Sequence, residues 1–155
     1  MKYSAKMSMR VLIADDQRGV GTTLAALVAG CDHEVVEVVG SGFDAIQAYH
    51  RHLPDVVLMD YHMPRLNGAT ACRNILSRYP KANIILVSGV AGAEDLAHSG
   101  AIAMLSKPVD LAKLKVLLSA PSPQGEDRSD RCSPQTEIAH SQPVELSQVQ
   151  AEATG

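Results

Sequence analysis

The sequence predicts an α/β protein in which helices cover both faces of a parallel, doubly wound five-stranded sheet. Short and almost uninterrupted apolar runs recur along the chain, and such runs are typical of strands buried on both faces of a sheet. Segments with helically spaced apolar residues lie between them, so strands and helices alternate. Aromatic residues make up only 3% of the chain, which indicates a core of aliphatic side chains.

The first half of the chain contains three predicted strands. Residues 10–14 and 55–60 are apolar runs that end in carboxylates, and the Val-rich residues 34–39 form a strand between them. The helix after the first strand ends near Gly30, and the next helix has Ser41 as its N-cap. Helical spacing predicts that this second helix buries Phe43, Ile46, Tyr49 and Leu53.

The second half of the chain contains two more strands. A helical stripe ends before Pro80, and residues 83–87 form the fourth strand. Residues 90–99 contain few large apolar side chains, so we expect a short and weakly held helix there. Residues 101–105 form the fifth strand, and a closing helix starts from Asp110 as N-cap. With right-handed crossovers, these elements favour the flavodoxin-like strand order 2-1-3-4-5.

Composition limits the domain organisation. The chain has 155 residues, of which 46% are hydrophobic, enough for one soluble domain with a good core. We expect a flexible leader over 1–9, a folded domain over 10–120 and a disordered tail over 121–155. The tail is rich in Pro, Ser, Gln, Glu and Asp, and such a segment cannot bury enough apolar surface to offset its ordering entropy.

Charge and cysteine content exclude several classes of protein. With a net charge of -3 and no long block of Lys and Arg, the chain has no electrostatic footprint for nucleic acid, so direct DNA binding is not expected. The N-terminus resembles neither a signal peptide nor a membrane helix. The three cysteines lack a CxxC spacing, which favours reduced thiols in a cytoplasmic protein, and Cys72 is expected to be a small core residue.

Four of the five predicted strands offer polar residues at or near their ends: Asp15 and Asp16, Asp60, Ser88 and Lys107. Since the carboxyl ends of parallel strands meet at one edge of a sheet, these side chains should converge in one crevice. Three neighbouring carboxylates repel one another unless a cation joins them, and Mg²⁺ suits such oxygen ligands. A lysine and a hydroxyl beside them suit an anion, so the crevice is predicted to receive a phosphoryl group on a carboxylate.

Each of these residues could instead have a purely structural role, without binding a metal or a phosphoryl group. Asp15 and Asp16 could cap the first helix, Lys107 could be a solvated lysine before a loop, and the hydroxyl of Ser88 could cap the next turn. The side chain of His62 is expected to be exposed beside the carboxylates rather than to bind a metal.

Four motifs, which follow one another along the chain, are similar to those of a known family. They are Val-Leu-Ile-Ala-Asp-Asp, Asp-Val-Val-Leu-Met-Asp-Tyr-His-Met-Pro-Arg-Leu-Asn-Gly, Ile-Ile-Leu-Val-Ser-Gly and Gly-Ala-Ile-Ala-Met-Leu-Ser-Lys-Pro. Through them, the chain from about Arg10 to Leu118 resembles the receiver domain of two-component response regulators, including single-domain regulators of the chemotaxis type.

The resemblance implies a role for each residue of the crevice. Asp60 would accept a phosphoryl group from the phospho-histidine of a sensor histidine kinase or a phosphotransfer protein. Asp16 and Asp60 would bind Mg²⁺ directly, Asp15 through water, and His62 through its backbone carbonyl. Such a protein is not expected to be an enzyme, and it would switch the binding of a downstream protein that the sequence does not identify, or relay the phosphoryl group.

The resemblance also implies how the phosphoryl group is held. Ser88 would donate a hydrogen bond to it, and Lys107 would pair with it, with a cis peptide bond before Pro108. Phosphorylation would draw the Ser88 hydroxyl inward and move the loop that follows.

The sequence departs from the family at two places. Met104 stands where receivers usually have the Tyr or Phe that couples to the phosphorylation site, and the interval from Ser88 to Lys107 is about one turn short. A truncated fourth helix and a different output are therefore expected. Val90 offers no polar group to orient water, so we expect a long-lived phosphoryl group.

Three other functions stay open on the sequence alone. A phosphorylation-independent adaptor could keep this fold. A Mg²⁺-dependent aspartyl phosphohydrolase of the haloacid-dehalogenase type normally needs a second Asp two residues after the nucleophile, where this chain has His62. A flavodoxin-like cofactor binder is disfavoured because Asp15 and Asp16 would repel a phosphate.

Overall fold

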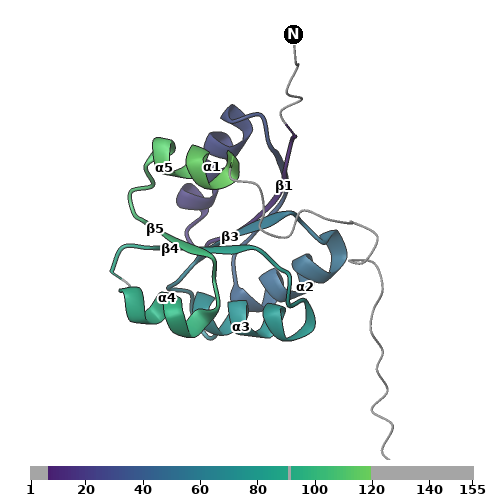
Figure 1. Ribbon diagram of the computed structural model, residues 1–155, viewed down its shortest axis with the longest axis vertical. Helices are drawn as coiled ribbons and strands as arrows, with labels where there is room; N and C mark the ends of the chain where they lie inside the picture. Colours follow the sequence, from purple (N-terminus) through teal and green to yellow (C-terminus); the bar gives the residue numbers. More distant parts are fainter. Residues whose placement is uncertain (1–6, 91, 120–155) are drawn as a thin grey trace, which may run out of the picture.

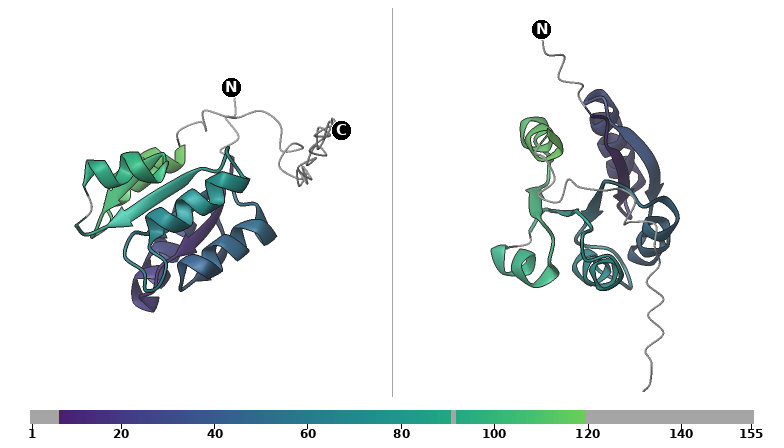
Figure 2. Two further views of the ribbon diagram at one scale, coloured as in Figure 1. Left: turned by 90° about the horizontal axis from the view of Figure 1, so that it is seen from below. Right: turned by 45° about the vertical axis from the view of Figure 1, so that its right-hand side comes forward.

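The computed structural model describes residues 7–90 and 92–119, which form a five-stranded parallel sheet between two layers of helices (Figures 1 and 2). The strands are β1 (Arg10–Ala14), β2 (Glu34–Val39), β3 (Val56–Asp60), β4 (Ile84–Ser88) and β5 (Ala103–Ser106). The helices are α1 (Arg18–Gly30), α2 (Gly42–His52), α3 (Gly68–Arg78), α4 (Ala93–Ser99) and α5 (Leu111–Ser119). Their order in the sheet, β2-β1-β3-β4-β5, confirms the predicted fold class and strand order.

The strands in the middle of the sheet are apolar except at their ends, because both of their faces are covered. Helices α2, α3 and α4 lie on one side of the sheet and α1 and α5 on the other (Figure 1). Along β1, Leu12 belongs to the core under α2 and α3, whereas Val11 and Ile13 belong to the core under α1 and α5. Successive residues of one strand therefore enter two different cores.

Helix caps confirm two predicted starts. The Ser41 hydroxyl accepts a hydrogen bond from the Asp44 amide at 3.0 Å, and the Asp110 carboxylate accepts one from the Ala112 amide at 2.8 Å. Helix α4 has seven residues, in keeping with the short fourth helix expected from the sequence. The fifth strand, in contrast, begins at Ala103 and not at residue 101.

The prediction that Phe43 is buried is wrong, since 62% of this residue is exposed. The buried positions of α2 are Gly42, Ala45, Ala48 and Tyr49, which recur three or four residues apart on one face. Phe43 comes one residue after the first of them and so lies off that face. Gly42 is required there because a Cβ at this position would lie 2.7 Å from the Leu66 carbonyl oxygen.

The predicted termini are only partly described. Met7 and Ser8, from the expected leader, are exposed, and the predicted tail over 121–155 lies outside the described residues. Within the described part of the chain, no helix has the length and apolar character needed to cross a membrane.

Candidate functional site

The parallel register brings the ends of four strands together at one edge of the sheet. Asp60 pairs with Val87, and Ser88 pairs with Ser106, the residue before Lys107. β1 ends level with β3, where Ala14 pairs with Met59. The residues at or just after the ends of these strands therefore meet, as the sequence predicts.

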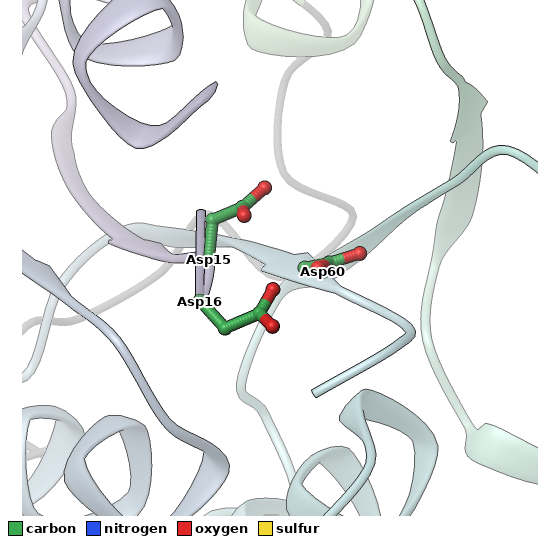
Figure 3. Close-up of side chains that lie close together, drawn as sticks. All are labelled: Asp15, Asp16 and Asp60. Atoms are coloured by element: carbon green, nitrogen blue, oxygen red, sulfur yellow. The ribbon is translucent and has the colours of Figure 1, made fainter. Parts of the chain in front are cut away.

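Asp15, Asp16 and Asp60 form a cluster of carboxylates. Each offers one oxygen that lies within 4.8 Å of the oxygens of the other two. Figure 3 shows the Asp15 and Asp16 side chains reaching toward the side on which Asp60 lies. Asp15 and Asp60 are buried, whereas Asp16 is exposed. The donor set is hard oxygen only, which fits a cation such as Mg²⁺.

Burial and the neighbouring charge of Asp15 raise the pKa of Asp60, which is only 4% exposed. The ammonium of Lys107 opposes this rise, because its Nζ lies 3.2 Å from an Asp60 carboxylate oxygen. A carboxylate whose charge is costly and only partly compensated gains from any further positive charge that enters the site.

Lys107 lies between the two buried carboxylates. Its Nζ donates to Asp15 Oδ2 at 3.1 Å and is also within 3.2 Å of Asp60. Burial alone would lower the pKa of Lys107, but the hydrogen bonds to Asp15 and Asp60 outweigh it and raise the pKa. The alternative prediction, that Lys107 is an ordinary solvated lysine before a loop, is therefore wrong. The peptide bond between Lys107 and Pro108 is cis, as expected.

Asp15 and Asp16 do not cap the first helix. The N-cap of α1 is Gln17, and no side chain caps this helix. Asp15 Oδ1 instead accepts a hydrogen bond from the Gln17 amide at 2.8 Å, and Oδ2 accepts from Lys107. Both oxygens of Asp15 are thus held in place, which orients its carboxylate toward the crevice.

Ser88 is buried, with 4% of the residue exposed. Its Oγ accepts a hydrogen bond from the Val90 amide at 3.2 Å, so the turn-capping interpretation holds in this conformation. Val90 itself is 87% exposed. If this oxygen moved toward a group on Asp60, it would move away from the Val90 amide.

The loop from β3 to α3 is shaped by two tight contacts. A Cβ at Gly68 would lie 2.2 Å from the Asp60 carbonyl oxygen, so only glycine fits there. Arg65 has φ 70°, and the Leu66 amide donates to the Pro64 carbonyl at 2.8 Å across it, the pattern of a strained γ-turn. Sequence reasoning missed both contacts, although the Pro-to-Gly spacing of this motif is a signal for a tight loop.

The residues after Asp60 contribute backbone and ring contacts. The His62 amide donates to Asp60 Oδ1 at 3.3 Å, and the His62 side chain is exposed, as predicted. The Tyr61 hydroxyl donates to Asp95 Oδ1 at 2.8 Å. Sequence reasoning missed this pair, because 34 residues separate its members.

The folded region matches a known protein family. Residues 11–119 match the model of the response regulator receiver domain. This span contains Asp15, Asp16, Asp60, Ser88 and Lys107.

Curated relatives share this region at modest identity. A protein-glutamate methylesterase/protein-glutamine glutaminase of Geobacter metallireducens is 38% identical over 107 residues, which cover 64% of this chain but only 30% of that protein. The chemotaxis protein CheY of Listeria monocytogenes is 32% identical over 82 residues, covering 53% of this chain and 69% of that one. The chain thus spans about 30% of the length of the methylesterase relatives.

Solved structures share the fold. The receiver domain of a sensor histidine kinase from Pseudomonas aeruginosa superposes with a TM-score of 0.66 at 26% identity, covering 72% of this chain and 95% of that one. In that crystal structure, a magnesium ion is coordinated in the active site cleft.

Proposed function

The chain belongs to the family of response regulator receiver domains, and from this premise we propose that Asp60 accepts a phosphoryl group and thereby switches the binding of a partner protein or relays the group. The observation that carries the proposal is the position of Lys107 Nζ, 3.1 Å from Asp15 and 3.2 Å from Asp60. A buried carboxylate beside a fixed cation and two further acids is suited to phosphoryl transfer.

Mg²⁺ fits the acidic cluster. We propose that Asp16 and Asp60 bind the ion directly, that Asp15 binds it through water, and that the His62 carbonyl supplies a further ligand. The hydrogen bonds that already engage both Asp15 oxygens support an indirect role for this residue. When bound, Mg²⁺ would neutralise part of the negative charge on the acids and on the phosphoryl oxygens.

The chain's own residues would act in one displacement. An Asp60 oxygen forms a bond to phosphorus while the bond from phosphorus to the donor's histidine nitrogen breaks, and the imidazole leaves with the electron pair of that bond. Lys107 pairs with the charge on the transferred group, and Ser88 donates a hydrogen bond to it. The product is an acyl phosphate on Asp60.

The proposed donor is a sensor histidine kinase or a phosphotransfer protein in the cytoplasm. Signalling is favoured over turnover of a separate phosphate ester, because His62 stands where an aspartyl phosphohydrolase needs its second Asp. A phosphorylation-independent adaptor is disfavoured because Lys107, Asp15 and Asp60 are already in contact.

The test is phosphorylation by phosphoramidate with and without Mg²⁺, measured by intact mass. We expect a Mg²⁺-dependent gain of one phosphoryl group in the wild type and none in Asp60→Asn. Asp32→Asn is the matched control. Asp32 is exposed with φ 65°, a conformation that asparagine tolerates, and it precedes β2 at the opposite end of the sheet.

Each outcome has a clear meaning. A gain in the wild type and in Asp32→Asn, but not in Asp60→Asn, supports the receiver function. A gain that persists in Asp60→Asn contradicts the assignment of Asp60. No gain in the wild type contradicts phosphorylation and favours the adaptor.

A further inference from the structure

We propose that the hydrogen bond between Tyr61 and Asp95, called the latch below, holds the protein in its unphosphorylated conformation and opens when Asp60 is phosphorylated. The proposal rests on the proposed function, because its trigger is the acyl phosphate on Asp60. It adds a regulatory contact to the acidic crevice.

The latch connects the phosphorylation site to α4 through one carboxylate. The Tyr61 hydroxyl donates to Asp95 Oδ1 at 2.8 Å, and the Gly92 amide donates to Asp95 Oδ2 at 3.0 Å. Asp95 is the third residue of α4, and Tyr61 directly follows Asp60. The two oxygens of Asp95 thus tie the start of α4 to the residue beside the phosphoacceptor.

The Tyr61 side of the latch is fixed by the backbone. The Tyr61 amide donates to the Val87 carbonyl at 2.9 Å, and the Tyr61 carbonyl accepts from the Gly68 amide at 2.8 Å. These bonds hold Tyr61 to β4 and to the start of α3. The latch therefore opens by rotation of the Tyr61 ring or by movement of Asp95, and not by movement of the Tyr61 backbone.

Asp95 lies on α4, a helix that is held by few buried side chains. Helix α4 has only seven residues and is bounded by glycine at both caps, Gly92 and Gly100. Among its residues whose side chains the structure describes, only Ser99 is buried. A short helix with so little buried side-chain surface shifts at low energetic cost.

The hydroxyl of Ser88 connects the trigger to this helix. Its Oγ accepts from the Val90 amide in the present conformation. Drawing this oxygen toward a phosphoryl group on Asp60 would move it away from the Val90 amide. Gly92, two residues further along the chain, donates to Asp95 Oδ2, so a shift of Val90 would disturb this bond of the latch.

The latch is a charge-assisted hydrogen bond. The Tyr61 hydrogen bond holds the pKa of Asp95 below its usual range, and Asp95 raises the pKa of Tyr61. Hydrogen bonds to an ionised acceptor are stronger than neutral ones. Met104 lies in the same core cluster as Tyr61 but has no hydroxyl, so Tyr61 supplies a phenol contact that Met104 cannot.

A contact present in only one of two conformations biases the equilibrium between them. Because the latch belongs to the unphosphorylated conformation, its removal favours the conformation that accepts the phosphoryl group. Coupling free energies between two sites at the low end of the usual range change an equilibrium constant by about fivefold. We expect an effect of this size on the equilibrium between the two conformations.

The test measures the rate of phosphorylation by phosphoramidate with Mg²⁺, read by intact mass. We expect Tyr61→Phe to react about fivefold faster than the wild type, and Asp95→Ala to react faster as well. In the Asp95→Ala background, Tyr61→Phe should have no further effect, because its partner is already absent. Tyr79→Phe is the matched control, since its hydroxyl contacts His50 on α2, and its rate should equal that of the wild type.

Tyrosine emission provides a second measurement. The chain has no Trp and four Tyr, so tyrosine emission is observable, and a carboxylate that accepts the phenol hydrogen bond quenches it. Emission should therefore rise on phosphorylation of the wild type and of Tyr79→Phe, and should change less in Tyr61→Phe.

The outcomes separate this proposal from the proposed function. Equal or slower phosphorylation of Tyr61→Phe, with a normal mass gain in the wild type, overturns the latch and leaves the proposed function standing. An additive effect of the two substitutions also overturns the latch. No mass gain in any variant overturns both proposals.

Discussion

Replacing Gly68 by alanine should both destabilise the protein and impair phosphorylation. The new Cβ would lie 2.2 Å from the Asp60 carbonyl oxygen and 3.0 Å from Tyr61 Cα, and both are backbone atoms. Real Cβ contacts are essentially never below 3.0 Å, so α3 and Asp60 must separate by about 0.8 Å or more. Forced overpacking of this kind costs typically 1–3 kcal/mol.

The expected loss of folding free energy in Gly68→Ala is measured by urea denaturation and thermal unfolding. For a domain of about 110 residues, a loss of about 2 kcal/mol lowers Tm by roughly 8 °C. Because the displaced atom belongs to the phosphoacceptor residue, the rate of phosphorylation by phosphoramidate should fall by tenfold or more, on the order of what small misplacements cost.

Gly19→Ala is the matched control for this substitution. Gly19 lies in α1, and a Cβ there would have no neighbour within 4 Å. Alanine in a helix is more favourable than glycine by about 0.5–1 kcal/mol, so this variant should be as stable as the wild type or more stable. A Gly68→Ala protein that unfolds at the wild-type urea concentration would refute the reasoning.

Three further predictions concern single sites. Without Mg²⁺, Asp60→Asn should be more stable than the wild type at pH 7, because burial and Asp15 raise the pKa of Asp60. The cost of this ionisation is present above the folded-state pKa and absent below the unfolded value, so the difference in urea denaturation should shrink as the pH falls toward about 4; a difference that grows would contradict it. Arg65→Gly should be more stable than Arg65→Ala by about 1 kcal/mol, because only glycine relieves φ 70° without strain; equal denaturation midpoints would contradict this. Burial raises the pKa of Cys72 to about 12, so iodoacetamide at pH 8 should leave this thiol unmodified in the native state and alkylate it in urea, as peptide mapping would show.

The folding pattern and the carboxylate cluster could be predicted from local sequence. Apolar runs followed by Asp15 or Asp60 report burial on both faces and a polar residue at a strand end, and both properties belong to short segments. Parallel pairing then brings the strand ends together without any further information. This is why Asp15, Asp16, Asp60, Ser88 and Lys107 could be named before their positions were known.

The tertiary structure decided what depends on contacts between distant segments. Phe43 has the helical spacing of a core residue, but α2 places Gly42 against Leu66 and leaves Phe43 exposed. Tyr61 meets Asp95 because the loop after β3 lies beside the start of α4. Such contacts depend on how elements pack in three dimensions. The spacing of residues within one segment therefore cannot predict them.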